Sequence, residues 1–360
     1  MAGLHQFVPT FEPGAVGGHM AELQRLWRES GRGESEVFAE HHRGGFQGRD
    51  FRDYGTRRFP ARPGDVLVYQ MAIGSAVADF VKARPEPLVL NHHNLTPPEL
   101  LQQWEPGATW GVQWGMSQLR ELAGRTSLAV AVSHYNAAQL AEAGYHRIEV
   151  APVLFDIEAF NRDAEAEAVD ALLAAKAQGG TDWLFVGRLA ANKCQHDVVR
   201  AFAVYRRVYD PEARLHIVGA APADAYRSAL ERLVSTLGLQ GAVALTGGVS
   251  AQALAAYYRA ADVFVCLSEH EGFCVPLLEA MSNRVPVVAF AAAAVPETLG
   301  DGGLLLPSKE PAVVAAAAHR VVSDQAVREA LVSAGVKRLE DFTLERSRAR
   351  WLDVLDQAAR

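Results

Sequence analysis

Two glutamates in the segment 268–279 flank a short run that is typical of a helix start. Between Glu271 and Glu279 lies Gly-Phe-Cys-Val-Pro, and Pro276 suits the first turn of a helix. The first amides of a helix have no partner within it, so they can bind an anion or a ring of hydroxyl groups. These amides belong to Gly272, Phe273, Cys274 and Val275. The two carboxylates would repel a bare phosphate, so we expect them to accept hydrogen bonds from the hydroxyl groups of a sugar and a ribose.

A second segment, 185–193, carries two cations directly after a predicted buried strand. The strand ends at Gly187, Arg188 follows, Asn192 can cap the next helix, and Lys193 then falls in its first turn. A lysine there opposes the helix dipole by ~0.3–1 kcal/mol. Charge-assisted hydrogen bonds to a diphosphate, worth ~1.5–3 kcal/mol each, would offset this cost. The segment therefore predicts a diphosphate site that uses Arg188 and Lys193.

Short apolar runs that alternate with helical patterns predict the elements that position these residues. Continuous apolar strands separated by helices are typical of parallel sheets covered on both faces. The runs lie at 66–69, 88–91, 128–132, 183–186, 215–219, 243–246, 263–267 and 287–290, and a first strand is expected at 7–11. Eight such runs exceed one doubly wound half, so we expect an α/β chain with two Rossmann-like domains.

The length of 360 residues also favours two domains. We expect an N-terminal Rossmann-like domain at 1–155 and a C-terminal one at 156–342, with the hinge near 154–160. The acidic, alanine-rich stretch 163–178 has a helical pattern that stops at Gly179-Gly180. The tail 343–360 is predicted to be an amphipathic helix that crosses back to the N-terminal domain.

The composition excludes several classes of protein. With 35 basic and 42 acidic residues the net charge is −7, which argues against a nucleic-acid partner. The three cysteines form no Cys-x-x-Cys pair, no Asp-x-Asp occurs, and no His/Cys group has zinc spacing, so we expect neither a disulfide framework nor a bound metal. The first residues lack the regions of a signal peptide, so we expect a cytoplasmic protein, with peripheral membrane contact left open.

Taken together, the two segments resemble a known family. Glu-x7-Glu after a strand, with Gly-Arg-Leu-x-x-x-Lys some 80 residues upstream, is similar to the retaining nucleotide-sugar glycosyltransferases of the GT-B fold, family 4 (group 1). The resemblance covers the C-terminal half almost continuously. The run 246–262 looks like the family's base-binding loop and following helix, and the runs 285–297 and 302–306 look like its closing strands.

The N-terminal half resembles the family more loosely. Gly17 and Gly18 lie where the family has a glycine loop, and glycines there let the backbone approach a ligand closely. The end of the strand at 88–91 matches the position of the family's active-site histidine. By register we match His93, with His92 as the second choice.

This chain also departs from the family pattern at three places. Leu154-Phe155 replaces the Asn-Gly that usually precedes the aspartate matched by Asp156. Cys194 and Cys274 stand where glycine is common. We expect the larger side chain at 274 to narrow the sugar pocket, and we expect activity to survive because no charged group is lost.

The resemblance implies a GT-B fold with two Rossmann-like domains that face an interdomain cleft, and it implies roles for the residues above. Glu279 would hold the ribose, Glu271 and His93 the donor sugar, and the loop from Gly247 to Val249 the base, with Gly187 at the strand end. Arg188 and Lys193 would stabilise the leaving diphosphate in place of a metal. No cofactor is expected beyond the nucleotide-sugar substrate, and the sugar's configuration would be retained.

The sequence leaves the donor base, the sugar and the acceptor open. A glycan, a lipid-linked acceptor or a small molecule would each fit. The stretch 43–62, where arginines alternate with Phe46, Phe51, Tyr54 and Phe59, is either a solvated connection or a surface that contacts an acceptor or phospholipid. A GT-B-like phosphorylase, a sugar-nucleotide epimerase and a non-catalytic nucleotide-sugar sensor remain as alternative functions. The oligomeric state is left open.

Overall fold

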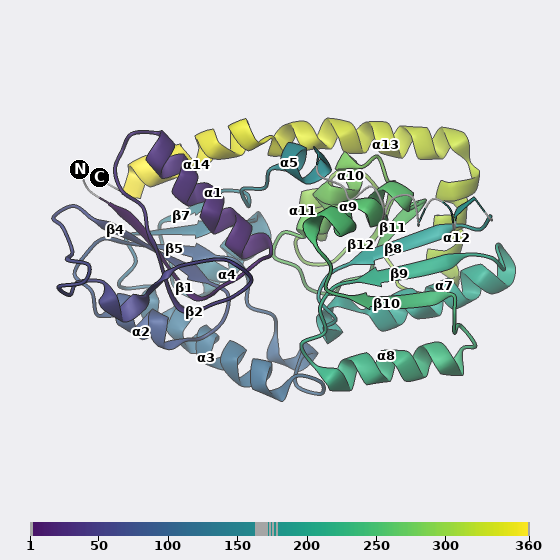
Figure 1. Cartoon of the computed structure of the whole chain (residues 1–360), viewed down its shortest axis with the longest axis horizontal. Helices are drawn as coiled ribbons and strands as arrows, with labels where there is room; N and C mark the ends of the chain where they lie inside the picture. The colour runs from purple at the N-terminus through teal and green to yellow at the C-terminus, as the bar shows by residue number, and fades with distance from the viewer. Residues whose placement is uncertain (1–2, 163–171, 173, 175, 178, 359–360) are drawn as a thin grey trace. The chain divides into compact units, whose positions relative to one another are not determined.

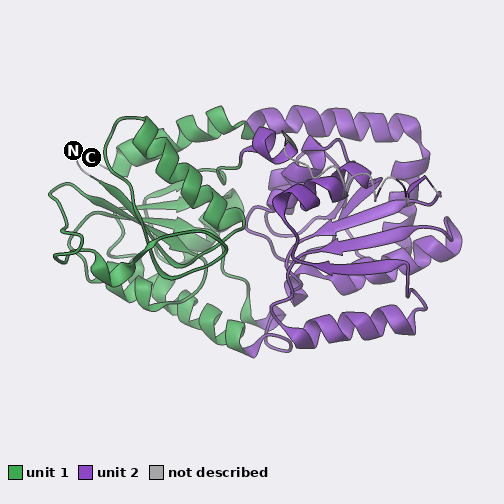
Figure 2. Cartoon of the chain, in the orientation of Figure 1, with its two compact units in different colours: residues 1–98, 107–155, 342–360 green, residues 99–106, 156–341 purple. Residues whose placement is uncertain are grey.

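The computed structural model describes residues 3–162, 172, 174, 176–177 and 179–358. The chain forms two compact units, which Figure 2 shows in separate colours. Unit 1 consists of residues 1–98, 107–155 and 342–360, and unit 2 of residues 99–106 and 156–341. Most of the predicted helix at 163–178 lies outside the described residues.

Unit 1 is built on a seven-stranded parallel sheet with the order β3-β2-β1-β4-β5-β6-β7. Its strands are β1 (Leu4–Phe11), β2 (Val37–His42), β3 (Arg49–Asp50), β4 (Val66–Met71), β5 (Leu88–His92), β6 (Leu128–Ala131) and β7 (Ile148–Val150). The order places β4 between β1 and β5, so residues far apart in sequence lie on neighbouring strands.

Helices cover both faces of this sheet (Figure 1). They are α1 (Ala15–Glu29), α2 (Ala76–Lys82), α3 (Pro106–Leu122), α4 (His134–Glu142) and α14 (Leu344–Ala358). One apolar core joins α1 and α14 to the strands and includes Leu23, Trp27 and the fully buried Trp351. The indole of Trp351 donates to the carbonyl of Pro152 at 2.8 Å, which ties the last helix to the segment after β7.

Unit 2 is built on a six-stranded parallel sheet with the order β10-β9-β8-β11-β12-β13. Its strands are β8 (Asp182–Val186), β9 (Arg214–Val218), β10 (Val243–Gly247), β11 (Val263–Cys266), β12 (Val287–Phe290) and β13 (Leu304–Leu306). Its helices are α5 (Ile157–Arg162), α7 (Gln195–Val208), α8 (Asp224–Thr236), α9 (Ala251–Ala260), α10 (Val275–Ser282), α11 (Val295–Leu299), α12 (Pro311–Ser323) and α13 (Gln325–Leu339). An apolar core packs α7, α8 and α12 against one face of the sheet.

The predicted α/β class with two parallel sheets is confirmed. Every apolar run singled out in the sequence forms a strand, because a strand covered on both faces must be apolar along its whole length. The sequence analysis missed β2, which ends in Glu40, His41 and His42 and therefore looks polar. Across the described residues, no helix is both long and apolar enough to cross a membrane.

Candidate functional site

The predicted site residues of unit 2 lie at the carboxyl ends of neighbouring strands. Gly247 ends β10, Gly187 follows β8, and Glu271 lies in the loop after β11, while β9 runs between β10 and β8. Strands of a parallel sheet end at the same edge, so the strand order gathers these residues along one edge. This is the usual place for ligands on such sheets.

Lys193 and Glu271 form an ion pair at the centre of this edge. Lys193 Nζ donates to Glu271 Oε2 at 2.5 Å, and the two side chains are 22% and 9% exposed. Burial alone would lower the pKa of Lys193, but the charge of Glu271 outweighs it, and the pKa lies above its ordinary value. The lysine is therefore a fixed cation in a place where water screens its charge weakly.

Asn192 brings the two turns together, and its predicted role as a helix cap is wrong. Helix α7 begins only at Gln195, so Lys193 lies in a short 3₁₀ turn before it rather than in its first turn. The Asn192 amide instead donates to the carbonyl of His270 at 3.0 Å, and the amide of Glu269 donates to the carbonyl of Asn192 at 2.9 Å. These two bonds hold the lysine turn against the glutamate loop.

The predicted helix start after the glycine turn is confirmed. Helix α10 begins at Val275 with Pro276 in its first turn. Within the described part of the chain, the amides of Gly272, Cys274 and Val275 make no hydrogen bond. These donors lie directly after Glu271 in the chain, so a positive helix end and a cation meet at this edge of the sheet.

Glu279 lies one turn inside α10, as predicted, and its side chain is buried. The Tyr258 hydroxyl donates to Glu279 Oε2 at 2.8 Å. Burial raises the pKa of Glu279 to about 7, although the hydrogen bond from Tyr258 opposes the shift. The carboxyl group therefore changes charge near neutral pH, and its carboxylate form is a strong acceptor for hydroxyl groups.

Arg188 contacts a different carboxylate from Lys193. Its guanidinium lies 3.5 Å from Glu105, whose side chain is 5% exposed, whereas that of Arg188 is 48% exposed. Glu105 belongs to the segment 99–106, which packs with unit 2 although it precedes β6 in the chain. Sequence reasoning missed Glu105 because nothing in the local pattern shows that this segment leaves unit 1.

Gly219 is a second residue that sequence reasoning missed. A Cβ at this position would lie 2.1 Å from the carbonyl oxygen of Gly187, so only glycine lets the end of β9 pass this close to the turn that carries Arg188. The glycine directly after the apolar run 215–218 was the available signal. Gly247, whose carbonyl accepts from the amide of Gly219, has a φ of 75°. Val249 lies on the loop that follows β10 and is 36% exposed.

The cysteines that replace family glycines both adopt a left-handed backbone. Cys194 has a φ of 53° and Cys274 a φ of 70°, and each precedes a helix. Cys274 Sγ also lies 3.9 Å from Cys266 Sγ. Cys266, Glu271 and Cys274 thus form one group whose ligand atoms lie close enough to hold a metal ion, and Cys194, His196 and Asp197 form another.

In unit 1, the predicted glycines differ in their surroundings. A Cβ at Gly17 would meet the carbonyl oxygen of Glu12 at 1.9 Å, so Gly17 is required for α1 to start this close to β1. At Gly18 a Cβ would meet nothing within 4 Å, so its surface is open to a ligand. His93, just after β5, bonds to Gln70 at 2.6 Å, whereas His92 bonds to Gln139 at 3.2 Å.

The aromatic residues of the stretch 43–62 are mostly internal. Phe51 and Tyr54 are 6% and 1% exposed, and Phe59 stacks edge-on against His5 and Phe38. The rings therefore anchor this connection to the sheet. Arg52, Arg57 and Arg58 are exposed, and two of them already pair with acidic neighbours, Arg52 with Asp50 and Arg58 with Asp53.

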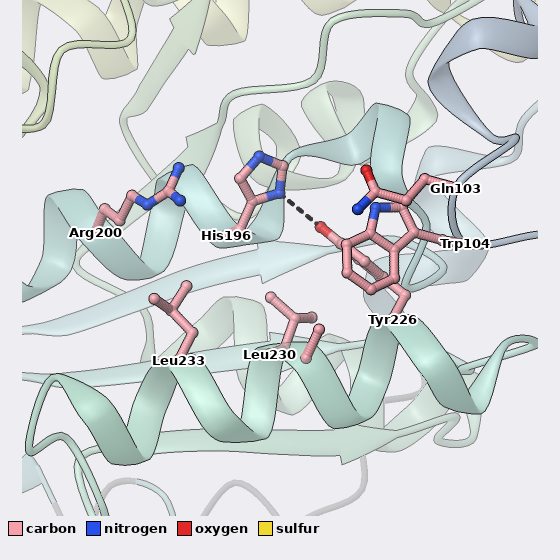
Figure 3. A pocket seen from close by; sticks show the side chains of 8 residues that line it. Gln103, Trp104, His196, Arg200, Tyr226, Leu230 and Leu233 are labelled. Carbon is pink, nitrogen blue, oxygen red and sulfur yellow. Dashed lines mark hydrogen bonds between the residues drawn. The ribbon is translucent and has the colours of Figure 1, made fainter.

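A cavity of about 360 Å³ lies elsewhere in unit 2, lined by residues of α7, α8 and the segment 99–106 (Figure 3). Trp104 and Tyr226 lie edge to face with ring centroids 5.6 Å apart, and the Tyr226 hydroxyl bonds to His196 at 2.9 Å. None of the predicted site residues lines it. It contributes nothing to the arrangement around Lys193.

Comparison with known proteins finds a family match in the C-terminal half. Residues 174–338 match the family described as "Glycosyl transferases group 1". This match, over less than half of the chain, bears out the predicted resemblance to the group 1 glycosyltransferases. Solved structures extend the likeness to the whole fold: HepE of Anabaena, in complex with UDP and glucose, covers 99% of this chain and 100% of its own with a TM-score of 0.74 and 19% identity.

Further similarities involve one solved structure and two curated proteins. Sucrose-phosphate synthase of Thermosynechococcus elongatus has a TM-score of 0.76 at 18% identity, with 99% of each chain covered. A D-inositol 3-phosphate glycosyltransferase of Geodermatophilus obscurus is 35% identical over 163 residues, which are 43% of this chain and 35% of that protein. A GDP-mannose-dependent phosphatidylinositol monomannoside mannosyltransferase of Mycolicibacterium smegmatis is 37% identical over 124 residues, 32% of this chain and 31% of its own length. This chain thus matches only about a third of the length of these two curated relatives. The solved structures show that the fold of this chain is GT-B.

Proposed function

We propose that this protein is a retaining glycosyltransferase that moves a hexose from a nucleoside diphosphate to a glycan, lipid-linked or small-molecule acceptor. The ion pair of the partly buried Lys193 and the buried Glu271, beside the unpaired amides that start α10, is the observation that carries the proposal. It lies within the stretch that matches the group 1 glycosyl transferases. Relatives described as sugar transferases, and a structural neighbour that holds UDP and glucose, support a nucleotide-sugar donor.

The chemistry follows from the charge that develops on the leaving group. Transfer breaks the bond between the anomeric carbon and the diphosphate, so negative charge grows on the phosphate oxygens. Lys193 and the amides of Gly272 and Cys274 would stabilise that charge without reorganising, which is the condition for a large electrostatic effect. When Lys193 pairs with the diphosphate instead of Glu271, the Glu271 carboxylate becomes free to accept hydrogen bonds from hydroxyl groups of the donor sugar.

The remaining predicted contacts divide by unit. In unit 2, Glu279 would accept the ribose hydroxyls, Gly247 and Val249 would lie against the base, and Arg188 would exchange Glu105 for phosphate. In unit 1, His93 would accept from a sugar hydroxyl, and the backbone at Gly18 would approach the donor. The acceptor would enter on the face that the diphosphate leaves, so the anomeric configuration would be retained.

We also propose that the reaction needs no metal, since side chains and amides supply the positive charge. Treatment with a chelator is therefore expected to leave the rate unchanged. An assay with EDTA, followed by addition of magnesium or zinc, checks this. Activity lost on chelation and restored by either ion would contradict it and would direct attention to the Cys266, Glu271 and Cys274 group.

A thermal-shift panel of UDP, GDP, ADP and their glucose and mannose conjugates tests the proposed function. A ligand that binds only the folded protein raises its melting temperature, by an amount that grows with ligand concentration. We expect one nucleotide to stabilise the protein and its sugar conjugate to be consumed when acceptor is added. Consumption with phosphate as the acceptor would indicate a phosphorylase. Conversion without an acceptor would indicate an epimerase, and binding without turnover a sensor.

A further inference from the structure

Three amide side chains form a buried polar line across unit 1. Gln6 on β1, Gln70 on β4 and Asn91 on β5 are each 0% exposed. Gln70 and Asn91 are direct partners in the register of β4 and β5, and β4 is the neighbour of β1. Most buried polar atoms are hydrogen-bonded, so the direction of each bond between these amides can be worked out from its partners.

The direction is set by a backbone group. Gln6 lies 2.8 Å from the carbonyl oxygen of Met20, and a carbonyl can only accept, so Gln6 presents its Nε2 there. Its Oε1 then faces Gln70 at 2.8 Å and must accept, so Gln70 presents its own Nε2. The Oε1 of Gln70 is left as the acceptor at the other end.

This acceptor assigns the tautomer of His93. His93 Nε2 lies 2.6 Å from Gln70 Oε1, and a bond of that length to an acceptor requires a proton on Nε2. Burial lowers the pKa of His93 well below its ordinary value, so the ring stays neutral and carries one proton. Nδ1 is then a lone-pair acceptor, and it has no hydrogen-bond partner among the residues that the structure describes.

Asn91 forms a side branch that leaves this assignment unchanged. Its Nδ2 donates to the same Gln70 Oε1 at 2.8 Å, so it lies beside His93 Nε2 as a second donor to one oxygen. The same Nδ2 lies 3.1 Å from His19 Nε2, while the amide of Leu154 donates to His19 Nδ1 at 3.1 Å. A neutral His19 can accept from only one of these two donors, so its tautomer stays undecided. The tautomer of His93, by contrast, follows from the Met20 carbonyl through Gln6 and Gln70.

We infer that Gln70, oriented by Gln6, is a positioning residue that holds His93 in the Nε2–H tautomer, so that Nδ1 accepts a hydrogen bond from a hydroxyl group of the donor sugar. The choice of a sugar hydroxyl rests on the proposed function, whereas the tautomer does not. A neutral ring that offers only a lone pair repels a phosphate oxygen and favours a hydroxyl donor. His93 is thereby distinguished from the cations of unit 2.

The tautomer is measured on the full chain without any ligand. In protein labelled with 15N-histidine, long-range 1H–15N correlations distinguish protonated from unprotonated ring nitrogens, and the spectrum of His93→Asn assigns the signals of His93. We expect the Nε2–H form in the wild type and a mixture of tautomers in Gln70→Leu. Gln70→Glu keeps an acceptor at this position and is expected to restore the Nε2–H form.

Gln118→Leu is the matched control for the loss of a buried amide in unit 1. Gln118 is 2% exposed, and its side chain contacts Ser75 and Asp79 rather than His93. This variant is expected to keep the wild-type tautomer even if its stability falls. An Nδ1–H form in the wild type, or an unchanged tautomer in Gln70→Leu, overturns the inference.

Binding experiments then test the choice of ligand group. Gln70→Leu is expected to weaken the binding of UDP-glucose or GDP-mannose, whichever the wild type binds, by about three- to tenfold. The binding of the free diphosphate should not change, because only the sugar reaches His93. If the tautomer shifts as expected but neither affinity changes, the sugar hydroxyl is the wrong ligand group. If the wild type binds neither conjugate, the proposed function fails together with this half of the inference, and the tautomer result stands.

Discussion

Both units place buried polar groups against a parallel sheet, but those groups differ in charge. In unit 2, Lys193 and Glu271 are a cation and an anion that neutralise each other. In unit 1, Gln6, Gln70 and His93 are neutral and are linked donor to acceptor. A charged pair can exchange its partner for a charged ligand, whereas a neutral chain of amides has no spare charge to give. Under the proposed function, unit 2 would therefore stabilise the charge of the leaving group, and unit 1 would orient one hydrogen-bond acceptor.

The substitution Lys193→Met tests the charged pair of unit 2 and should have the largest effect on turnover. It removes the fixed cation, so we expect kcat to fall by about 10²–10³-fold. It also leaves Glu271 as a buried carboxylate without its partner, at a cost of about 3–5 kcal/mol in stability. Steady-state kinetics and chemical denaturation measure the two effects separately.

Arg214→Met provides the control for the loss of a buried ion pair in unit 2. Arg214 is 22% exposed, as Lys193 is, and it bonds to Asp182 at 2.7 Å at the amino ends of β8 and β9. We expect this variant to lose stability and keep kcat. The double change Lys193→Met with Glu271→Gln should recover stability but not turnover. Full turnover in Lys193→Met would remove the lysine from the mechanism.

Glu279→Gln should affect the nucleotide rather than the rate. Removing the carboxylate is expected to weaken diphosphate-nucleoside binding by about 10- to 100-fold, the worth of a charged hydrogen bond. Because burial raises the pKa of Glu279 to about 7, wild-type affinity should rise with pH through that value and the variant's should not. Calorimetry between pH 5.5 and 8.5 measures both.

The same group gives unit 2 a stability that falls as the pH rises. The folded pKa of about 7 lies above the ordinary 4.5, so the native state holds the proton longer than the unfolded chain. Stability is therefore full below pH 4.5 and is lost towards pH 7, by about 3 kcal/mol in total. Tyr258→Phe removes the bond that opposes the shift, so it should move the pKa of Glu279 higher. A lower pKa in that variant would contradict the assignment.

Unit 1 should show the opposite slope because of His19. Burial lowers the pKa of His19 to about 3, and the ring is packed against Asn91, His93 and Trp351. The unfolded chain takes up a proton below the ordinary 6.5 while the native state does not, so stability falls on acidification. The loss from this group is about 2 kcal/mol between pH 6.5 and pH 5. His19→Gln should remove that part of the slope in denaturation at several pH values, and an unchanged slope would contradict it.

The smallest effect is expected from Cys274→Gly. The change relieves a left-handed backbone, worth about 1–2 kcal/mol, but it loses a buried side chain of similar value. The net change in the free energy of unfolding should lie within about 1 kcal/mol. Cys266→Gly, in the regular strand β11, gains no such relief and should cost about 2 kcal/mol. Equal losses in the two variants would show that the backbone at 274 is not strained.

The sequence predicted those parts of the site that depend on neighbouring residues. The start of α10 followed from Gly272 and Pro276, and the turn after β8 followed from an apolar run that ends at Gly187. Asn192 looked like a cap for the same local reason, but the carbonyl of His270, 78 residues away, takes its side chain instead. A local sequence pattern contains no information about a hydrogen-bond partner this far away in the chain.

The amino-acid sequence by itself therefore determined the strands and the helix starts. Both can be recognised from a few neighbouring residues, because turn geometry and burial on both faces of a sheet restrict the residue types locally. What only the tertiary structure decided is which side chains meet. Arg188 pairs with Glu105, and Gln6, Gln70 and His93 form one line, because the strand order inserts β4 between β1 and β5 and the segment 99–106 packs with unit 2. Such side-chain contacts depend on the packing of the whole chain. The energy of that packing is spread over contacts between residues far apart in sequence.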